Sequence, residues 1–281
     1  MSEPWTTARY LIPPRQCTPD NQNPFSAAGA YEPGFTGLAI IEDGDPFVGL
    51  SKTDLFHYKF RRDDPNIEAI VADFLRYEND HGCTPILFFP EDMDIDNFVR
   101  HALRTTPPPH VIRDTDPKYL LHSTSLRAGE QILRDQELKS FAVLSRDHPA
   151  RLDWHGLRSS SLGEPAEYAD QINLGLMDNP GGETVQASHA AGRFLSPDDS
   201  YTPGFRFYFD GHRIIKDKLD VRIAWTVKVR NRLPLDPYLV AAISVTDVNP
   251  RRETENWTPR LFTEQANIVF LQQVNGRKNN S

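Results

Sequence analysis

Residues 119–126, which read YLLHSTSL, constrain the fold of this chain more than any other stretch. The first three residues form an apolar run of the kind that a buried strand uses. His122 and Thr124 then point to one side of that strand, because successive side chains alternate between its faces. Thr124 or Ser125 is placed to cap a helix over 127–135. We therefore predict a strand that ends, presents an imidazole and a hydroxyl, and turns directly into a helix.

The composition is that of a globular protein. The 281 residues include 25% charged and 38% hydrophobic residues, which leaves room for one large or two modest domains. No apolar run approaches the roughly 18 residues of a membrane helix. The first residues lack the basic-then-apolar pattern of a signal peptide. We therefore expect a cytoplasmic protein with no membrane segment.

The sequence also gives no reason to expect a metal. Cys17 and Cys83 are too few for a disulfide framework or a cysteine zinc site. Asp92, Asp94 and Asp96 alternate as in a calcium loop, but that loop requires Gly at its sixth position and Glu at its twelfth, and neither is present. Acidic residues near the start of a helix account for the run.

The stretch TTPPP at 105–109 marks the predicted domain boundary, because its proline run is stiff. Residues 1–34, rich in Pro, Asn, Gln and Ser, predict an irregular arm. Residues 35–108 predict a small α/β domain of unknown role, and residues 109–281 form the second domain. The elements expected in the small domain are a hairpin over 37–50, a helix over 67–75, a strand over 85–89 and a helix that opens at Pro90.

Strand patterns prevail in the second domain. Residues 222–230 alternate apolar and polar side chains and give the clearest strand of the chain. Strand-rich sequence with few helices between the strands is typical of an α+β fold built on antiparallel sheets. The other elements expected are strands over 141–145, 205–209, 239–245 and 268–272, and a helix over 166–176.

The charge is unevenly placed. The formal net charge of −8 arises from the first 110 residues, since acidic and basic residues balance in the remainder. An acidic half is a poor surface for duplex DNA, which requires clustered cations. Residues 205–232, by contrast, hold eight basic residues against three acidic ones, interleaved with aromatic residues. We predict that a nucleic acid bound by this chain would be single-stranded and would dock over 205–232.

Three stretches resemble motifs of the ADP-ribosyltransferase superfamily with the His-Tyr-Glu signature. The first is LLHSTSL at 120–126 with LKS at 138–140, which is similar to the "HxT" strand end and its following turn, although Glu137 replaces the usual Gly. The second, FRFYF at 205–209, resembles the "PFYF" strand of DarT-type DNA ADP-ribosyltransferases. The third, TEQANIVF at 263–270, resembles the "QAE" that precedes a late strand in that family.

The resemblance implies split antiparallel β-sheets of the ADP-ribosyltransferase type. It implies NAD as co-substrate, with ADP-ribose transferred to a macromolecular acceptor, nucleic acid or protein, and nicotinamide released. On this basis His122, Ser123 and Thr124 would bind NAD. Tyr208 would stack on the nicotinamide ring, or Phe207 or Phe209 if the register is shifted by one.

The third motif departs from the family. Asn267 stands where the catalytic Glu is expected, and Glu264 lies three residues earlier. We assign the catalytic carboxylate to Glu264, because an amide cannot offset developing positive charge. Arg158, 36 residues after His122, is the second catalytic candidate by resemblance. The alternatives are an RNA 2′-phosphotransferase-like enzyme, whose branch lacks that Glu, and an inactive module that binds NAD or ADP-ribose.

Overall fold

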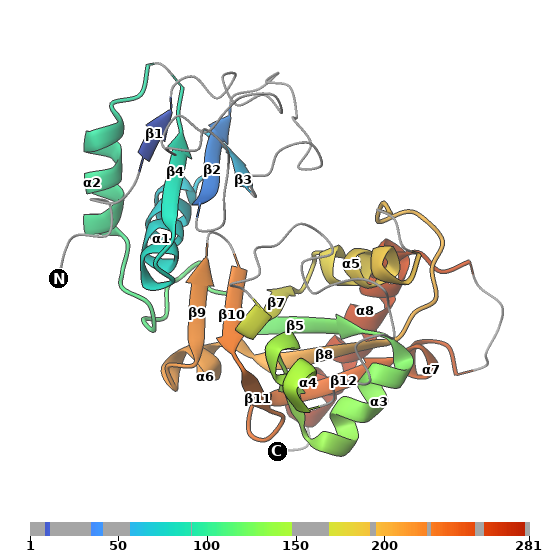
Figure 1. Ribbon diagram of the computed structural model, residues 1–281. Coiled ribbons are helices and arrows are strands. Elements are labelled where there is room, and N and C mark those ends of the chain that lie inside the picture. Colours follow the sequence, from blue (N-terminus) through green and yellow to red (C-terminus); the bar gives the residue numbers. More distant parts are fainter. Residues whose placement is uncertain are drawn as a thin grey trace. The chain divides into compact units, whose positions relative to one another are not determined.

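The computed structural model describes residues 9–11, 35–41, 57–90, 92–147, 169–191, 195–223, 226–250 and 256–278 (Figure 1). The chain divides into two compact units. Unit 1 consists mainly of residues up to Pro109, and unit 2 mainly of residues from His110 onward. The division therefore falls directly after the proline run.

Unit 1 is built on a four-stranded sheet with the order β1-β4-β2-β3. The printed pairings β1–β4, β2–β4 and β2–β3 are all parallel. Both edges of β2 are thus occupied, so β2 is not half of the hairpin predicted over 37–50, whose second half lies outside the described residues. The elements of unit 1 are β1 (Arg9–Leu11), β2 (Phe35–Ile41), β3 (His57–Arg61), α1 (Ile67–Asp80), β4 (Thr84–Phe88) and α2 (Ile95–Thr105).

The helices of unit 1 follow from their local sequence. The buried side chains of α1 include Val71, Phe74 and Leu75, which pack on Leu38 of β2. The helix α2 begins at Ile95 rather than at Pro90, because Asp94 is its N-cap and accepts a hydrogen bond from the backbone N–H of Asn97 at 3.1 Å. This cap explains one of the alternating aspartates, and Asp92 pairs with Arg62 at 2.8 Å.

Unit 2 contains a separate two-stranded sheet of β6 and β11 and, apart from residues 221–226, which are grouped with unit 1, the strands of a six-stranded sheet with the order β12-β8-β5-β7-β10-β9. The pairs β12–β8, β8–β5, β5–β7 and β7–β10 are all antiparallel. The mixed α+β class predicted from the sequence is therefore confirmed. The elements are β5 (Tyr119–Thr124), α3 (Leu126–Asp135), β6 (Glu137–Lys139), α4 (Phe141–Asp147), β7 (Gln171–Leu176), α5 (Gly181–Ala191), β8 (Phe205–Asp210), α6 (Gly211–Lys216), β9 (Asp220–Ile223), β10 (Thr226–Arg230), β11 (Arg232–Pro234), β12 (Leu239–Ser244), α7 (Val245–Val248) and α8 (Pro259–Lys278).

The large sheet of unit 2 has two differently covered faces. On one face Leu120, Phe207 and Phe209 form an apolar cluster against which α3 packs through Ile132 and Leu133. On the opposite face Leu121, Tyr208 and Ile243 pack against Phe262 and Phe270 of α8. The strand period of two decides which side chains share a face, and helices cover both faces of the sheet (Figure 1).

The sheet divides at β7. This strand pairs with β5 only at Leu120 and Leu121, through Leu176 and Gly175. Its other residues, 171–174, pair with β10. The strand β5 continues beyond Leu121 along β8 alone, as far as Thr124. The residues 122–124 therefore lie where β7 leaves β5.

Three predicted elements are wrong. Residues 141–145, expected as a strand, lie in α4, and residues 171–176 of the helix expected over 166–176 lie in β7, while residues 166–168 are outside the described residues. Residues 268–272, also expected as a strand, lie inside α8. A short apolar run fits a buried strand and a buried helix equally well. In α8 the buried residues Phe262, Ala266 and Phe270 recur every four positions, whereas Ile268 is exposed, which is the pattern of a helix.

The remaining strand predictions hold. Residues 205–209 and 239–245 correspond to β8 and β12. The strand expected over 222–230 is divided into β9 and β10, and residues 224–225 between them lie outside the described residues.

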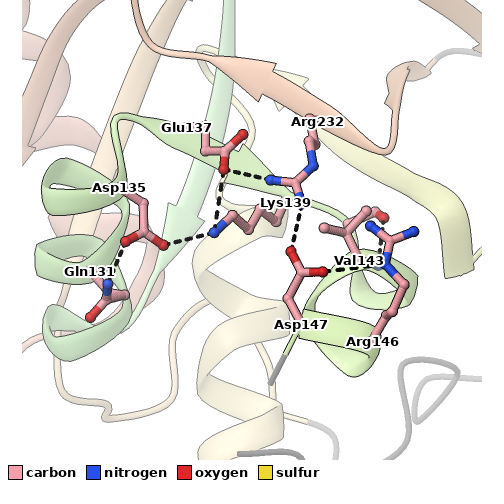
Figure 2. A network of polar contacts seen from close by, with 9 residues as sticks. Gln131, Asp135, Glu137, Lys139, Val143, Arg146, Asp147 and Arg232 are labelled. Carbon is pink, nitrogen blue, oxygen red and sulfur yellow. Dashed lines mark hydrogen bonds and ion pairs between the residues drawn. The ribbon is translucent and has the colours of Figure 1, made fainter. Parts of the chain in front are cut away.

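Ion pairs join β6 and β11 to their neighbouring helices (Figure 2). The guanidinium of Arg232 contacts Glu137 at 2.6 Å and Asp147 at 2.5 Å. The ammonium of Lys139 contacts Asp135 at 3.0 Å and Glu137 at 3.3 Å. Each charged group in this surface network has a partner of opposite sign, so the network is structural and offers no unpaired cation to a ligand.

Candidate functional site

The end of β5 has the form that the sequence predicts. It passes at Ser125 into α3, and the Ser125 hydroxyl accepts a hydrogen bond from the backbone N–H of Ala128 at 3.3 Å. The predicted helix cap is thereby confirmed. His122 and Thr124 lie half-buried on the same face of the sheet as Leu120. An imidazole and a hydroxyl are therefore held side by side on a strand end fixed by the following helix.

The His122 ring is oriented by β7. Its Nδ1 lies 3.3 Å from the backbone carbonyl oxygen of Asn173. A carbonyl only accepts hydrogen bonds, so Nδ1 carries the proton and Nε2 is the acceptor of the neutral ring. Burial lowers the pKa of His122 from its ordinary value, against the opposing effects of the Asn173 carbonyl and the negative charge of Glu183. The imidazole is therefore neutral at physiological pH.

Ser123 does not join His122 and Thr124, because it lies on the opposite face of the sheet. Its hydroxyl donates a hydrogen bond to Oε1 of Glu183 at 2.6 Å. Glu183 lies in the first turn of α5 and is fully buried. The Ser123 hydroxyl is thus committed to a contact within the protein, which does not fit its predicted role in binding NAD.

Glu183 belongs to a buried polar network beneath α5 and α8. Its Oε1 accepts a hydrogen bond from Arg206 Nη1 at 2.5 Å, and both side chains are at most 1% exposed. The second terminal nitrogen of Arg206 donates to the Met177 carbonyl at 2.6 Å. Glu183 Oε2 and Arg206 Nε have no hydrogen-bond partner among the described residues. The two charged groups are in contact, but each keeps one buried polar atom without a hydrogen bond to the described part of the chain.

Tyr208 and Asn267, from the second and third motifs, meet in the same interior. The Tyr208 hydroxyl donates to Asn267 Oδ1 at 2.9 Å, and Asn267 Nδ2 donates to the Met177 carbonyl at 2.8 Å. The Tyr208 ring is 0% exposed and stacks on Phe270, with 4.0 Å between centroids and 6° between planes. Burial raises the pKa of the Tyr208 phenol, so it remains a neutral hydrogen-bond donor.

The assignment of Tyr208 to nicotinamide stacking is therefore not supported by this structure. Neither face of its ring is accessible, and the ring lies on the face of the sheet opposite His122. Phe207 and Phe209 share the face of His122, but both are 0% exposed and belong to the apolar core. None of the three aromatic residues proposed for stacking presents a ring surface.

The assignment of Glu264 depended on a strand that does not form. Glu264 lies on α8, and its side chain is exposed on the outer side of that helix, whereas the neighbouring Thr263 is buried. Successive residues of a helix point about 100° apart, and Glu264 lies outside the buried side of α8 that Phe262, Thr263, Ala266 and Asn267 form. Glu264 thus shares no site with His122. Arg158, the other catalytic candidate, lies outside the described residues.

Residues 205–232 do not present all of their cations to solvent: Arg213, Lys216, Lys218 and Arg230 are exposed, and the others are not free. Arg206, Arg222 and Lys228 are buried, and Arg232 is held in the ion-pair network of Figure 2. Burial on alternate faces of strands disperses charges that are close together in the sequence. Phe207, Tyr208 and Phe209 lie in the core, so no aromatic platform for unpaired bases is formed there.

Sequence reasoning missed two residues that define this region, Asn173 and Glu183. Glu183 could have been noticed because it follows Gly181 and Gly182, since glycines allow a helix to approach a strand closely. A side chain at Gly182 would place its Cβ 2.8 Å from the Ser123 hydroxyl. Asn173 acts through its backbone carbonyl, and no sequence signal marks such a role.

Among the described residues no group of three His, Cys, Asp or Glu side chains could hold a metal ion. No described helix is long and apolar enough to span a membrane. No family model, curated protein or solved structure matches this chain.

Proposed function

We propose that unit 2 binds NAD⁺ at the end of β5 and transfers its ADP-ribose group to a macromolecular acceptor, with release of nicotinamide. The observation that carries the proposal is the placement of His122 at the division of the sheet. Its imidazole is half-buried, neutral and tied through Nδ1 to Asn173, where the β5–β7 pairing ends. This placement agrees with the split sheet and the ribose-binding histidine that the sequence resemblance implies.

The chemistry of ribose binding supports this role for His122 and Thr124. The neutral imidazole offers Nε2 as an acceptor for a ribose hydroxyl, and a threonine hydroxyl both donates and accepts. Removal of one partner from such a hydrogen bond leaves the other unsatisfied, which costs about 1.5–3 kcal/mol. His122→Ala should therefore weaken NAD⁺ binding by roughly 10- to 150-fold.

Calorimetric titration of the purified chain with NAD⁺ tests this expectation. Glu264→Gln is the matched control, because the exposed Glu264 carboxylate has no part in the site and its loss should leave the affinity unchanged. Wild-type affinity in His122→Ala would remove this residue from the proposal.

Transfer is tested separately by incubation of the protein with labelled NAD⁺ and cell lysate. Label that becomes attached to macromolecules supports the proposal, and its sensitivity to nuclease or to protease distinguishes a nucleic-acid acceptor from a protein acceptor. Arg158→Ala should reduce transfer on the order of a hundredfold if that cation stabilises the transition state. Transfer at the wild-type rate in this variant would exclude Arg158 from catalysis.

A second candidate is a module that binds NAD⁺ or ADP-ribose without chemistry. It is favoured by the position of the third motif, in which Glu264 is exposed and Asn267 is bound to Tyr208. This candidate predicts calorimetric binding with neither nicotinamide release nor transfer of label. The RNA 2′-phosphotransferase alternative, which also lacks the Glu, would depend on the exposed cations of 205–232, which are Arg213, Lys216, Lys218 and Arg230.

A further inference from the structure

The first turn of α5 is docked onto β5 at the residue between His122 and Thr124. Gly182 makes this approach possible, since a Cβ there would lie 2.8 Å from Ser123 Oγ and 3.1 Å from Ser123 Cβ. The carboxylate of the next residue, Glu183, accepts a hydrogen bond from the Ser123 hydroxyl at 2.6 Å. A steric contact and a hydrogen bond therefore fix α5 and Ser123 to one another.

Glu183 is itself held from a second strand. Arg206 of β8 contacts it at 2.5 Å, and Arg206 is the register partner of Ser123 across the β5–β8 pair. The carboxylate thus joins two adjacent strands at one register position. Because both ionic side chains are buried, movement of either strand would break a contact that water cannot replace without cost.

We propose that Glu183 is a positioning residue for His122 and Thr124, acting through Ser123 from beneath the sheet. Ser123 is covalently joined to both residues, so fixing its backbone fixes the direction in which their side chains leave the strand. The His122 ring meets the Asn173 carbonyl at 3.3 Å, a contact that a small shift of the strand would break. This inference rests on the proposed function, for which His122 and Thr124 are the ligand-binding pair.

Glu183 also acts on His122 through its charge. Burial lowers the pKa of His122, and the negative charge of Glu183 partly offsets this effect. Removal of the charge should therefore shift the His122 titration to lower pH. Loss of that charge acts directly on the imidazole, so the titration reports the proximity of Glu183 to His122, whereas the NAD⁺ affinity of Ser123→Ala reports positioning through Ser123.

Two variants test the proposal. Glu183→Gln removes the charge and keeps the size, and Ser123→Ala removes the hydroxyl link and keeps the buried ion pair intact. Ser123→Ala guards against the chance that Glu183→Gln fails to fold with Arg206 unpaired. Glu130→Gln on α3 is the control, because the Glu130 carboxylate is exposed and lies 4.0 Å from its partner Arg134.

The readouts are NAD⁺ affinity by calorimetry and the His122 titration by NMR, assigned by comparison with His122→Gln. We expect both test variants to weaken NAD⁺ binding by at least about tenfold, which is the scale of one lost hydrogen bond. Glu183→Gln should also shift the His122 titration to lower pH, and Glu130→Gln should change neither quantity. Wild-type affinity in Ser123→Ala, or an unmoved titration in folded Glu183→Gln, would overturn the proposal.

Failure of the proposed function would give a different result from failure of the positioning role. If the wild-type chain does not bind NAD⁺, the ligand is wrong. The His122 titration is measured without ligand, so it still reports whether Glu183 acts on this residue.

Discussion

The two faces of the large sheet in unit 2 are stabilised in opposite ways. On the face covered by α3, Leu120, Phe207 and Phe209 contact only other apolar groups within their cluster. On the face covered by α5 and α8, Arg206 and Tyr208 alternate with them and bind Glu183 and Asn267. The same strand, β8, supplies both sets. The face under α3, the apolar face, depends on packed volume, whereas the face under α5 and α8, here called the polar face, combines an apolar cluster with matched polar partners.

This difference explains why Tyr208 and Asn267 do not lie beside His122, as the sequence motifs suggested. A tyrosine and an asparagine beside a buried arginine satisfy one another's hydrogen bonds, and buried polar groups require such satisfaction. They are thereby removed from contact with any ligand. The His122 side chain, by contrast, is not enclosed in that network, because it lies at the end of the apolar face, where the β5–β7 pairing has stopped.

The largest effect is expected from breaking the buried ion pair on one side only. Arg206→Met leaves the Glu183 carboxylate buried without its cation and should lower the free energy of unfolding by about 3–5 kcal/mol. Urea denaturation followed by circular dichroism measures the loss. The double variant Glu183→Leu/Arg206→Met should recover most of it, because two apolar side chains need no partner. A double variant as unstable as Arg206→Met would contradict the view that the polar face depends on pairing.

A substitution on the apolar face should lower the free energy of unfolding by less than Arg206→Met does. Phe207→Leu keeps an apolar side chain at a 0% exposed position of β8, next to Arg206. We expect a loss below about 1.5 kcal/mol, as for other substitutions that nearly conserve core volume. The same denaturation experiment applies. If Phe207→Leu destabilised the protein as much as Arg206→Met, the contrast between the faces would disappear.

A smaller effect is expected when one neutral hydrogen bond is removed from the polar face. Tyr208→Phe keeps the ring that stacks on Phe270 and deletes the hydroxyl that donates to Asn267. The expected loss is about 1 kcal/mol, the net contribution of such a bond. Asn267→Ala and the double variant complete a mutant cycle, and additive losses would show that the two side chains are not coupled.

The smallest effect is expected in the surface network of Figure 2. Partial desolvation raises the pKa of Asp147, but Arg232 and Arg146 outweigh it, and the pKa lies below its ordinary value. Stability from this group is thus present at neutral pH and is lost as the pH falls through that lowered pKa. Arg232→Gln should slightly lower the melting temperature at low salt, and high salt should remove the difference. A difference that persists at high salt and at acidic pH would exclude a screened ion pair as its cause.

The hydrogen bond to Asp135 raises the pKa of Lys139 above its ordinary value, and Glu137 adds to this effect. The Lys139 contribution is therefore complete at neutral pH and is lost only as the pH rises through the raised pKa. The two titrations lie at opposite ends of the pH range, so Asp147 and Lys139 are both charged between them.

The sequence by itself determined those features that nearest neighbours control. The apolar run at 119–121 and the apolar-aromatic run at 205–209 predicted β5 and β8, and the strand period of two predicted that His122 and Thr124 share one face. The serine before a helical run predicted the cap of α3, and the spacing of apolar residues predicted α1. Each of these depends on residues within one strand or one helical turn, where the period of the backbone fixes the side-chain direction.

Only the tertiary structure decided what covers each face and which polar groups meet. Residues 268–272 became helix because Phe262, Ala266 and Phe270 could be buried together against the sheet, which a short apolar run does not reveal. Glu183 lies 60 residues from Ser123 and 23 from Arg206. No local pattern links three such positions, because they meet only when α5, β5 and β8 pack together, and a charge buried by that packing requires a partner.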